Sequence, residues 1–250
     1  MRIINRSPYL DADGEILPGA NKLAAEEFGP NWKKLISGEN RIAAAIDAIL
    51  DERYVLIREV NLPMVGPIEM ILLGPTGVHI LSAHHLGGMY KAEGEEWQSY
   101  DSRQMQFSRD TDNPIERARA VSSHLREVLH SRSLPVPFVN AAVVMSSVDT
   151  KLTLEGPVVN IIAFNEIEHF ISTDILAGEV IMDAGDVSTV EGFILEHALE
   201  PKNIDLERSA PSGFFGMKRQ QLIVLGVMAV LDLCLLGGFA FLVLRNTLGS

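Results

Sequence analysis

Two apolar runs joined by a short turn constrain the fold of this chain most strongly. The runs lie in the stretch IEMILLGPTGVHILSA, residues 68–83, where Gly-Pro-Thr-Gly stands between them. Apolar runs bounded by Gly and Pro indicate buried strands, and the short connection predicts a hairpin. A sheet that contains such strands must be covered by other elements, because its apolar side chains have to be removed from water.

The segments around this hairpin alternate between helical and extended patterns. A helix is predicted at residues 37–52, where Ile42, Ile46 and Ile49 share one face. A second helix is predicted at residues 113–131, where Asn113 provides the cap and Pro114 suits the first turn. Further strands are expected at residues 53–62, 136–147 and 156–164, and a short hairpin around Gly94 is expected at residues 89–100. The predicted fold class is α/β, with a mixed central sheet flanked by helices.

Composition shifts along the chain suggest a division into six parts. The predicted parts are an N-terminal extension (1–37), a main domain (38–175), a C-terminal helical part of that domain (176–200), a linker (201–221), a transmembrane helix (222–244) and a tail (245–250).

The stretch Leu222–Leu244 is the predicted transmembrane helix. It contains 23 residues and one charge, and at 1.5 Å per residue it spans about 34 Å, enough for a bilayer core. Lys218 and Arg219 precede it and only Arg245 follows it, so the positive-inside rule places the folded part in the cytoplasm. The first thirty residues contain no long apolar run, which argues against a signal peptide. The expected protein is a single-pass, tail-anchored membrane protein.

Asp232 lies near the centre of this predicted span. A carboxyl group costs a few kcal/mol at that depth. One interpretation is a partner helix or self-association, helped by the small pair Gly237 and Gly238. The other is a protonated acid that a sufficiently hydrophobic helix tolerates.

The charge and cysteine content exclude some classes of site. The formal net charge is −12 and the one cysteine is Cys234. An acidic protein repels nucleic acid and anionic lipid, and no run of Lys and Arg suggests a basic groove. A lone cysteine excludes an intrachain disulfide and a cysteine-based metal cluster.

The second run of the hairpin ends in an unusual cluster. Ser82, His84 and His85 follow directly after its apolar residues. Strand ends beside loops are common places for chemistry, so this end of the hairpin is the candidate site.

Four motifs, taken in order, resemble the nuclease-related domain (NERD), a family similar to PD-(D/E)xK endonucleases. The likeness extends from Gly38 into the 170s. The motifs are Gly38-Glu39 at the start of a helix, the stretch REVNLPMVGPIEMILLGPTGVHIL at 58–81, Asn113-Pro114 at the start of the long helix, and AAVVMSS at 141–147. The resemblance implies a restriction-endonuclease-like architecture.

The resemblance also assigns the family's site residues, one position at a time. The helix glutamate corresponds to Glu39, and the hairpin aspartate corresponds to Glu69. The family's Glu-x-Lys falls on Ser82 and His84, and its helix glutamine falls on Arg117. Glu39 therefore matches the family pattern and position 69 keeps a carboxylate, while Ser82, His84 and Arg117 differ from that pattern.

These changes bear on the chemistry that the resemblance implies. Phosphodiester hydrolysis by this fold uses carboxylates to hold Mg²⁺ or Mn²⁺. Ser82 offers only a neutral hydroxyl, and His84 replaces the lysine only when it is protonated. We therefore expect a degenerate nuclease site in a non-catalytic binding or scaffold protein, with no cofactor. The alternative is a nuclease that uses Mg²⁺ or Mn²⁺ to cut DNA or RNA with a substituted site.

A repurposed metal site is a further alternative. Glu69 and His84 suit Zn²⁺ or Mn²⁺, but His79 or Glu39 would have to add a ligand. Otherwise Glu39 favours the dipole at the start of its helix, and His84 forms a hydrogen bond at the mouth of a loop.

Overall fold

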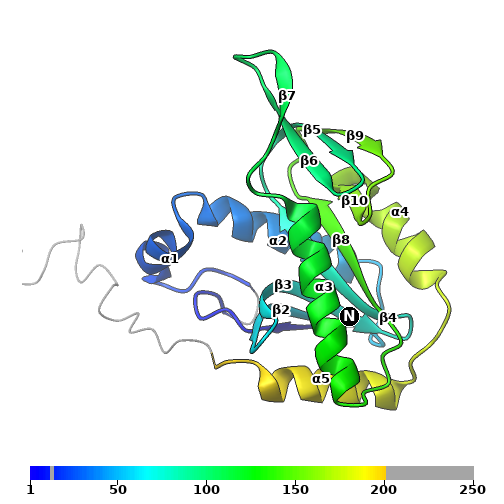
Figure 1. Ribbon diagram of the computed structural model, residues 1–250. Coiled ribbons are helices and arrows are strands. Elements are labelled where there is room, and N and C mark those ends of the chain that lie inside the picture. Colours follow the sequence, from blue (N-terminus) through cyan, green and yellow to red (C-terminus); the bar gives the residue numbers. More distant parts are fainter. Residues whose placement is uncertain (12–13, 201–250) are drawn as a thin grey trace, which may run out of the picture. The chain divides into compact units, whose positions relative to one another are not determined.

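The computed structural model describes residues 1–11 and 14–200 (Figure 1). Most of them belong to one compact unit, Met1–Leu17 and Ala24–Ile204, and the described part of a second unit is Pro18–Leu23. The described residues include no helix that is both long and apolar enough to cross a membrane. The predicted linker, transmembrane helix and tail, with Asp232, lie outside these residues.

A mixed sheet of six strands forms the centre of the main unit. Its order is β1-β2-β3-β4-β8-β10. Strands β2, β3 and β4 run antiparallel to one another, whereas β1 pairs parallel with β2, β8 with β4 and β10 with β8. The strands are β1 (Arg2–Asn5), β2 (Val55–Leu62), β3 (Gly66–Gly74), β4 (Gly77–His84), β8 (Val139–Met145) and β10 (Asn160–Ala163).

The predicted hairpin is β3 and β4. All residues of β4 are buried, as expected for a strand with neighbours on both edges and helices on both faces. Its register pairs Gly74 with Gly77 across the turn. Gly77 has a φ of 114°, a conformation that favours glycine.

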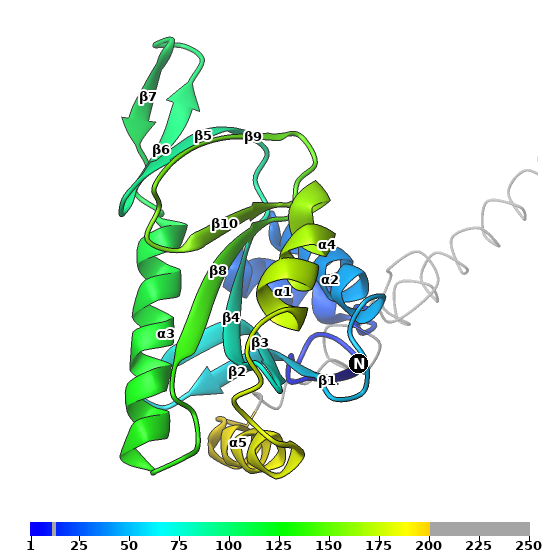
Figure 2. The same ribbon diagram turned by 90° about the vertical axis from the view of Figure 1, so that its right-hand side faces the viewer.

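Helices cover both faces of this sheet (Figure 2). On one face α2 and α4, with the short segments η1 and η2, enclose an apolar core around Leu72 and Leu81. On the other face α3 and α5 enclose a second core around Ile71 and Ile80. The bounds are α2 (Trp32–Asp47), α3 (Pro114–Ser131), α4 (Ile167–Phe170), α5 (Ala184–His197), the 3₁₀ turn η1 (Phe164–Glu166) and the π-helical η2 (Ile171–Leu176); α1 is Ala20–Phe28. The coarse prediction of an α/β fold is confirmed.

A second, four-stranded sheet lies beyond the first helical turn of α3 (Figure 1). Its order is β7-β6-β5-β9. Trp97 in this sheet is fully buried and packs in one core cluster with Ile115 of α3 and Met145 of β8. The strands are β5 (Gly88–Glu93), β6 (Glu96–Asp101), β7 (Gln106–Arg109) and β9 (Thr150–Glu155).

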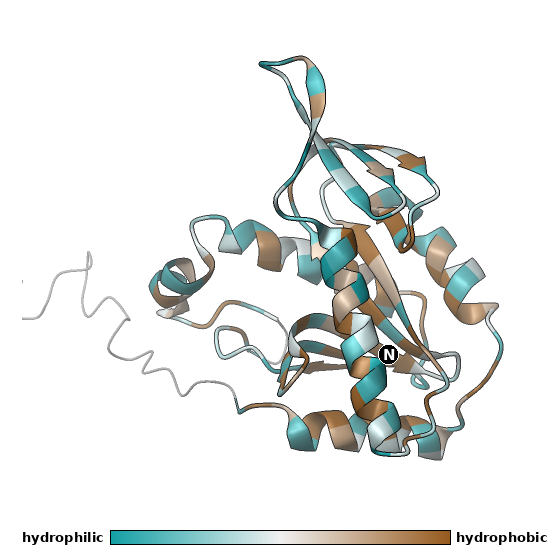
Figure 3. Cartoon of the chain, in the orientation of Figure 1, coloured by the Kyte–Doolittle hydropathy of each residue, from teal (hydrophilic) through white to brown (hydrophobic). Residues whose placement is uncertain are grey.

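The hydropathy of the chain follows these layers (Figure 3). Hydrophobic residues run along β8, whereas α3 shows hydrophilic and hydrophobic residues side by side. Its buried residues include Ile115, Ala118, Leu125 and Leu129, which recur at the helical period. The helix therefore buries one face on the sheet and keeps the other in water.

Three features of the fold differ from the sequence-based outline. Helix α2 begins at Trp32 and so crosses the predicted boundary after residue 37, and β1 adds residues 2–5 of the predicted extension to the sheet. Strands β7 and β9 were not predicted. Both are short, and most of their residues are exposed, so they lack the apolar pattern that reveals a buried strand.

Gly38 lets α2 approach the end of β8. A Cβ at this position would overlap the side chain of Ser146. We predict that Gly38→Ala lowers the free energy of unfolding by about 1–3 kcal/mol, the usual range for overpacking. Denaturation followed by the fluorescence of Trp32 and Trp97 measures this change.

Two variants control that measurement. Adding Ser146→Gly to Gly38→Ala removes the overlapping atoms and should recover part of the loss. Gly192 is in helix α5, and a Cβ added there would meet no atom within 4 Å, so Gly192→Ala should stabilise the protein by about 0.5–1 kcal/mol. Equal losses in both alanine variants would contradict the packing explanation.

Candidate functional site

The structure brings Glu69 and Ser82 together at one end of the hairpin. Ser82 Oγ donates a hydrogen bond to Glu69 Oε2 at 3.0 Å. The backbone N–H of Ala83 donates to the same oxygen. One carboxylate oxygen of Glu69 is thus already held by two donors from β4.

Arg117, on the first turns of α3, lies on the other side of this carboxylate. Its Nη2 is 3.9 Å from Glu69 Oε1, and its Nη1 donates to Asp112 Oδ1 at 2.7 Å. Burial raises the pKa of Glu69, while the charge of Arg117 and the bonds from Ala83 and Ser82 lower it. The carboxylate therefore has protein partners that favour its charged form on both oxygens.

His84 is turned into an aromatic cluster. Its ring meets Tyr90 and Trp97 edge-on, with centroids 5.2 and 5.6 Å away. The side chain is buried, and its Nε2 has no hydrogen-bond partner among the described residues. Burial lowers the pKa of His84 to about 4, so the ring is neutral near pH 7. It does not supply the positive charge that the family's lysine provides.

Glu39 is fully buried where α2 crosses β2. Arg58 Nη2 lies 3.3 Å from Glu39 Oε2, and both side chains are almost completely removed from solvent. Burial raises the pKa of Glu39 well above its usual range, and the charges of Glu59 and Glu69 add to this rise, while Arg58 opposes it. Because α2 begins at Trp32, Glu39 does not lie in the first turn of the helix, so the expectation that it favours the helix dipole is wrong. Glu39 instead joins Glu59 and Glu69 in a group of acids whose charges influence one another.

Glu59 is the member of this group that the sequence analysis missed. The register pairs Arg58 with Met70 and Val60 with Ile68, so Glu59 lies across from Glu69. Its φ is 55°, a left-handed conformation that costs a non-glycine residue on the order of 1 kcal/mol. Burial raises the pKa of Glu59 to about 7, and the charge of Glu69 adds to this shift, whereas a hydrogen bond with Glu39 lowers it. The charged pair Arg58-Glu59 inside an apolar strand was the available signal.

These donors do not fit a nuclease metal. Among residues 1–11 and 14–200, no three or more His, Cys, Asp or Glu side chains lie together in a way that could hold a metal ion. A hydroxyl stands at Ser82, where the family has a carboxylate, and it donates a hydrogen bond to Glu69. Mg²⁺ prefers several charged or carbonyl oxygens in tight octahedral geometry, and the structure does not provide that set.

A groove of about 610 Å³ opens beside the acids. Glu59, Glu69, His85 and Arg117 line its polar end. The remainder is lined mainly by apolar and aromatic side chains, namely Pro8, Tyr9, Phe28, Trp32, Leu35, Val60, Pro67, Ile68 and Leu199, with the polar or charged residues Arg6, Glu27, Asn31, Asn61 and Glu200 among them. Its size suits a small ligand, and its lining is of the kind that ligand pockets use.

The family comparison confirms the resemblance over part of its expected range, which extended from Gly38 into the 170s. The family model described as "NERD: Nuclease-related domain" matches residues 34–146. No curated protein and no solved structure matches the chain. Residues 34–146 are therefore a nuclease-related domain. This range contains Glu39, Glu69, Ser82, His84 and Arg117. The groove residues between Pro8 and Trp32 precede it.

The raised pKa of Glu59 predicts a pH-dependent stability. Its pKa rises on folding from 4.5 to about 7, so between these values only the folded state keeps the proton. Stability from this group is therefore lost as the pH rises through that window, by up to about 1.4 kcal/mol per pH unit. The glutamine in Glu59→Gln does not titrate. The free energy of unfolding of this variant, relative to that of the wild type, should therefore rise by this amount for each pH unit.

Chemical denaturation of both proteins at several pH values from 4.5 to 8 measures this difference. All other residues are the same in both proteins, so their contributions cancel in the comparison. Parallel stability curves for the wild type and Glu59→Gln would show that Glu59 is not a buried, protonated acid.

Proposed function

We propose that this chain is a nuclease-related protein that binds a ligand or partner and does not cleave nucleic acid. Its site is a restriction-endonuclease-like site that has lost catalytic groups. The observation that carries the proposal is the environment of Glu69, whose oxygens face Ser82, the N–H of Ala83 and Arg117.

Each difference from the family pattern lowers the expected rate of metal-dependent cleavage. A catalytic carboxylate holds a divalent cation, which polarises the phosphate and acidifies a water. Arg117 instead places a guanidinium near Glu69, and it repels an incoming cation. Ser82 brings no negative charge, and the buried His84 brings no positive one. The loss of a ligand and of a catalytic cation lowers the rate by orders of magnitude.

The groove suggests what replaces catalysis. Residues outside the matched domain, among them Tyr9 and Phe28, make one wall of it. An aromatic and apolar lining recognises apolar groups better than a phosphate backbone, and the net charge of −12 also disfavours nucleic acid. We therefore favour a binding or scaffold role over a nucleic-acid complex.

The proposed location rests on the sequence alone. Leu222–Leu244 would anchor the chain, with the folded domain in the cytoplasm. Asp232 would then provide a polar contact for a second copy or a partner helix. These three statements concern residues outside those that the structure describes.

Restoring the family's residues tests the proposal. Ser82→Glu, His84→Lys and Arg117→Gln together return the three changed positions. We predict that the wild type, full length in detergent, shows no metal-dependent cleavage of plasmid, single-stranded DNA or RNA. The triple variant should cleave at least about 100-fold faster with Mg²⁺ or Mn²⁺ than the wild type does, and chelator should stop it.

Glu69→Gln provides the matched control, because it keeps the shape of the side chain and removes its charge. It should abolish cleavage by the triple variant. Ser82→Glu alone serves if the triple variant does not fold, and it should raise the affinity for Mn²⁺. Metal-dependent cleavage by the wild type that disappears in Glu69→Gln would overturn the proposal.

That outcome would support the second candidate function, a nuclease with a substituted site. The observation in its favour is the convergence of Glu39, Glu59 and Glu69, whose charges influence one another. In that case Glu59 would supply the carboxylate that the family has at the position of Ser82.

A further inference from the structure

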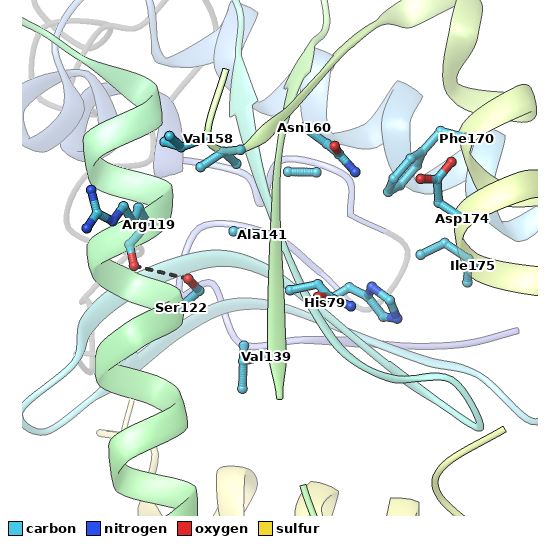
Figure 4. A pocket seen from close by; sticks show the side chains of 13 residues that line it. His79, Arg119, Ser122, Val139, Ala141, Val158, Asn160, Phe170, Asp174 and Ile175 are labelled. Carbon is cyan, nitrogen blue, oxygen red and sulfur yellow. Dashed lines mark hydrogen bonds between the residues drawn. The ribbon is translucent and has the colours of Figure 1, made fainter. Parts of the chain in front are cut away.

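A second cavity lies beside β8 and β10, with His79 of β4 in its lining (Figure 4). Its volume is about 410 Å³, and it is lined by His79, Asn140 and Asn160 together with Phe170, Asp174 and Ile175 of the helical segment that follows β10. Strand β10 pairs with β8 only from Ala142 onward. Val139–Ala141 therefore have no neighbour on that edge among the described residues, and the cavity fills the space left open.

His79 provides the most unusual group in this cavity. It is 4 % exposed, and its Nε2 has no hydrogen-bond partner within the described part of the chain. Burial lowers the pKa of His79 to about 4, while a hydrogen bond with the backbone of Thr76 and the charge of Asp174 raise it. Since Nε2 is unpartnered, the bond to Thr76 belongs to Nδ1, which acts as the donor. Nε2 then carries a free lone pair, and a buried acceptor without a partner is unfavourable.

The groups around this lone pair are also acceptors or neutral. In Figure 4 the His79 side chain points toward the side of the cavity that carries Phe170, Asp174 and Ile175. Asp174 is exposed and accepts a bond from Thr173 at 2.7 Å, and none of the described basic side chains forms an ion pair with it. Arg119 lies across the cavity on α3 and is paired with Glu95. The side of the cavity that holds His79 is therefore negative, with an aromatic ring beside it.

We propose that this cavity binds a small organic cation with N–H donors, an amine or guanidinium group that donates to His79 Nε2 and Asp174. Phe170 offers its ring to the same cation, and Ile175 and Ala142 contact its apolar part. An anion would meet a lone pair and a carboxylate. A metal ion would lack ligands, because no group of three suitable side chains exists among the described residues. The site is independent of the proposed function, since it lies at the opposite end of β4 from Ser82.

The test uses agmatine, an aliphatic guanidinium, with the full-length chain in detergent. Calorimetric titration at pH 7 gives the affinity, and the imidazole NMR signal of His79 reports contact with the ring. N-butylurea serves as the neutral comparison, since it has an uncharged urea in place of the guanidinium and lacks the terminal amine of agmatine. We expect saturable binding of agmatine with a shift of the His79 signal, and at least about tenfold weaker binding of N-butylurea.

Variants identify the groups involved. Asp174→Asn should weaken agmatine at least about tenfold, and Glu168→Gln, which removes an exposed charge from the adjacent helix, should not. His79→Phe keeps a ring and removes the acceptor, and it should also weaken binding. If His79→Phe does not fold, the proposal is still tested by the affinity of Asp174→Asn for agmatine and by the His79 NMR signal of the wild type.

Three results would overturn the proposal. The first is no saturable response to agmatine up to about 10 mM, which means that water alone fills the cavity. The second is the failure of either comparison, that is, equal affinity of the wild type for agmatine and N-butylurea or equal losses of agmatine affinity in Asp174→Asn and Glu168→Gln. The third is a saturable shift of the His79 signal with Zn²⁺ and none with agmatine.

Discussion

The burial of the hairpin β3–β4 is the constraint on which the rest of the structure depends. Its apolar side chains face both sides of the sheet, so α2 and α4 must cover one face and α3 and α5 the other. The same hairpin fixes the two candidate sites, because β4 carries His79 near its start and Ser82 near its end. One strand therefore carries a polar side chain of each candidate site.

The buried acids near the end of this hairpin interact with hydrogen-bond donors and guanidinium groups of the chain itself. Glu69 is held by Ser82, Ala83 and Arg117, and Glu39 by Arg58. A buried carboxylate without partners would be costly. Hydrogen bonds and guanidinium groups of the chain provide this stabilisation.

Much of the fold could be predicted from periodicity and turn residues, and part of the site could not. The hairpin, α2 and α3 carry long apolar patterns with clear ends, and Asn113 caps α3 as expected. Strands β7 and β9 are short and exposed, so no pattern reveals them. The positions of Glu39, Glu69 and Ser82 followed from the family motifs. Glu59 did not, because its left-handed φ and its interaction with Glu39 of α2 arise only in the folded chain.

Manganese binding to the full-length wild type tests the central claim most directly, because Mn²⁺ has a paramagnetic signal that reports bound and free ion. If the chain's own side chains take the place of the cation at Glu69, the signal should be that of free ion up to about 1 mM. Saturable binding at lower concentration that disappears in Glu69→Gln would contradict the account, since the carboxylate would then be free to hold a metal.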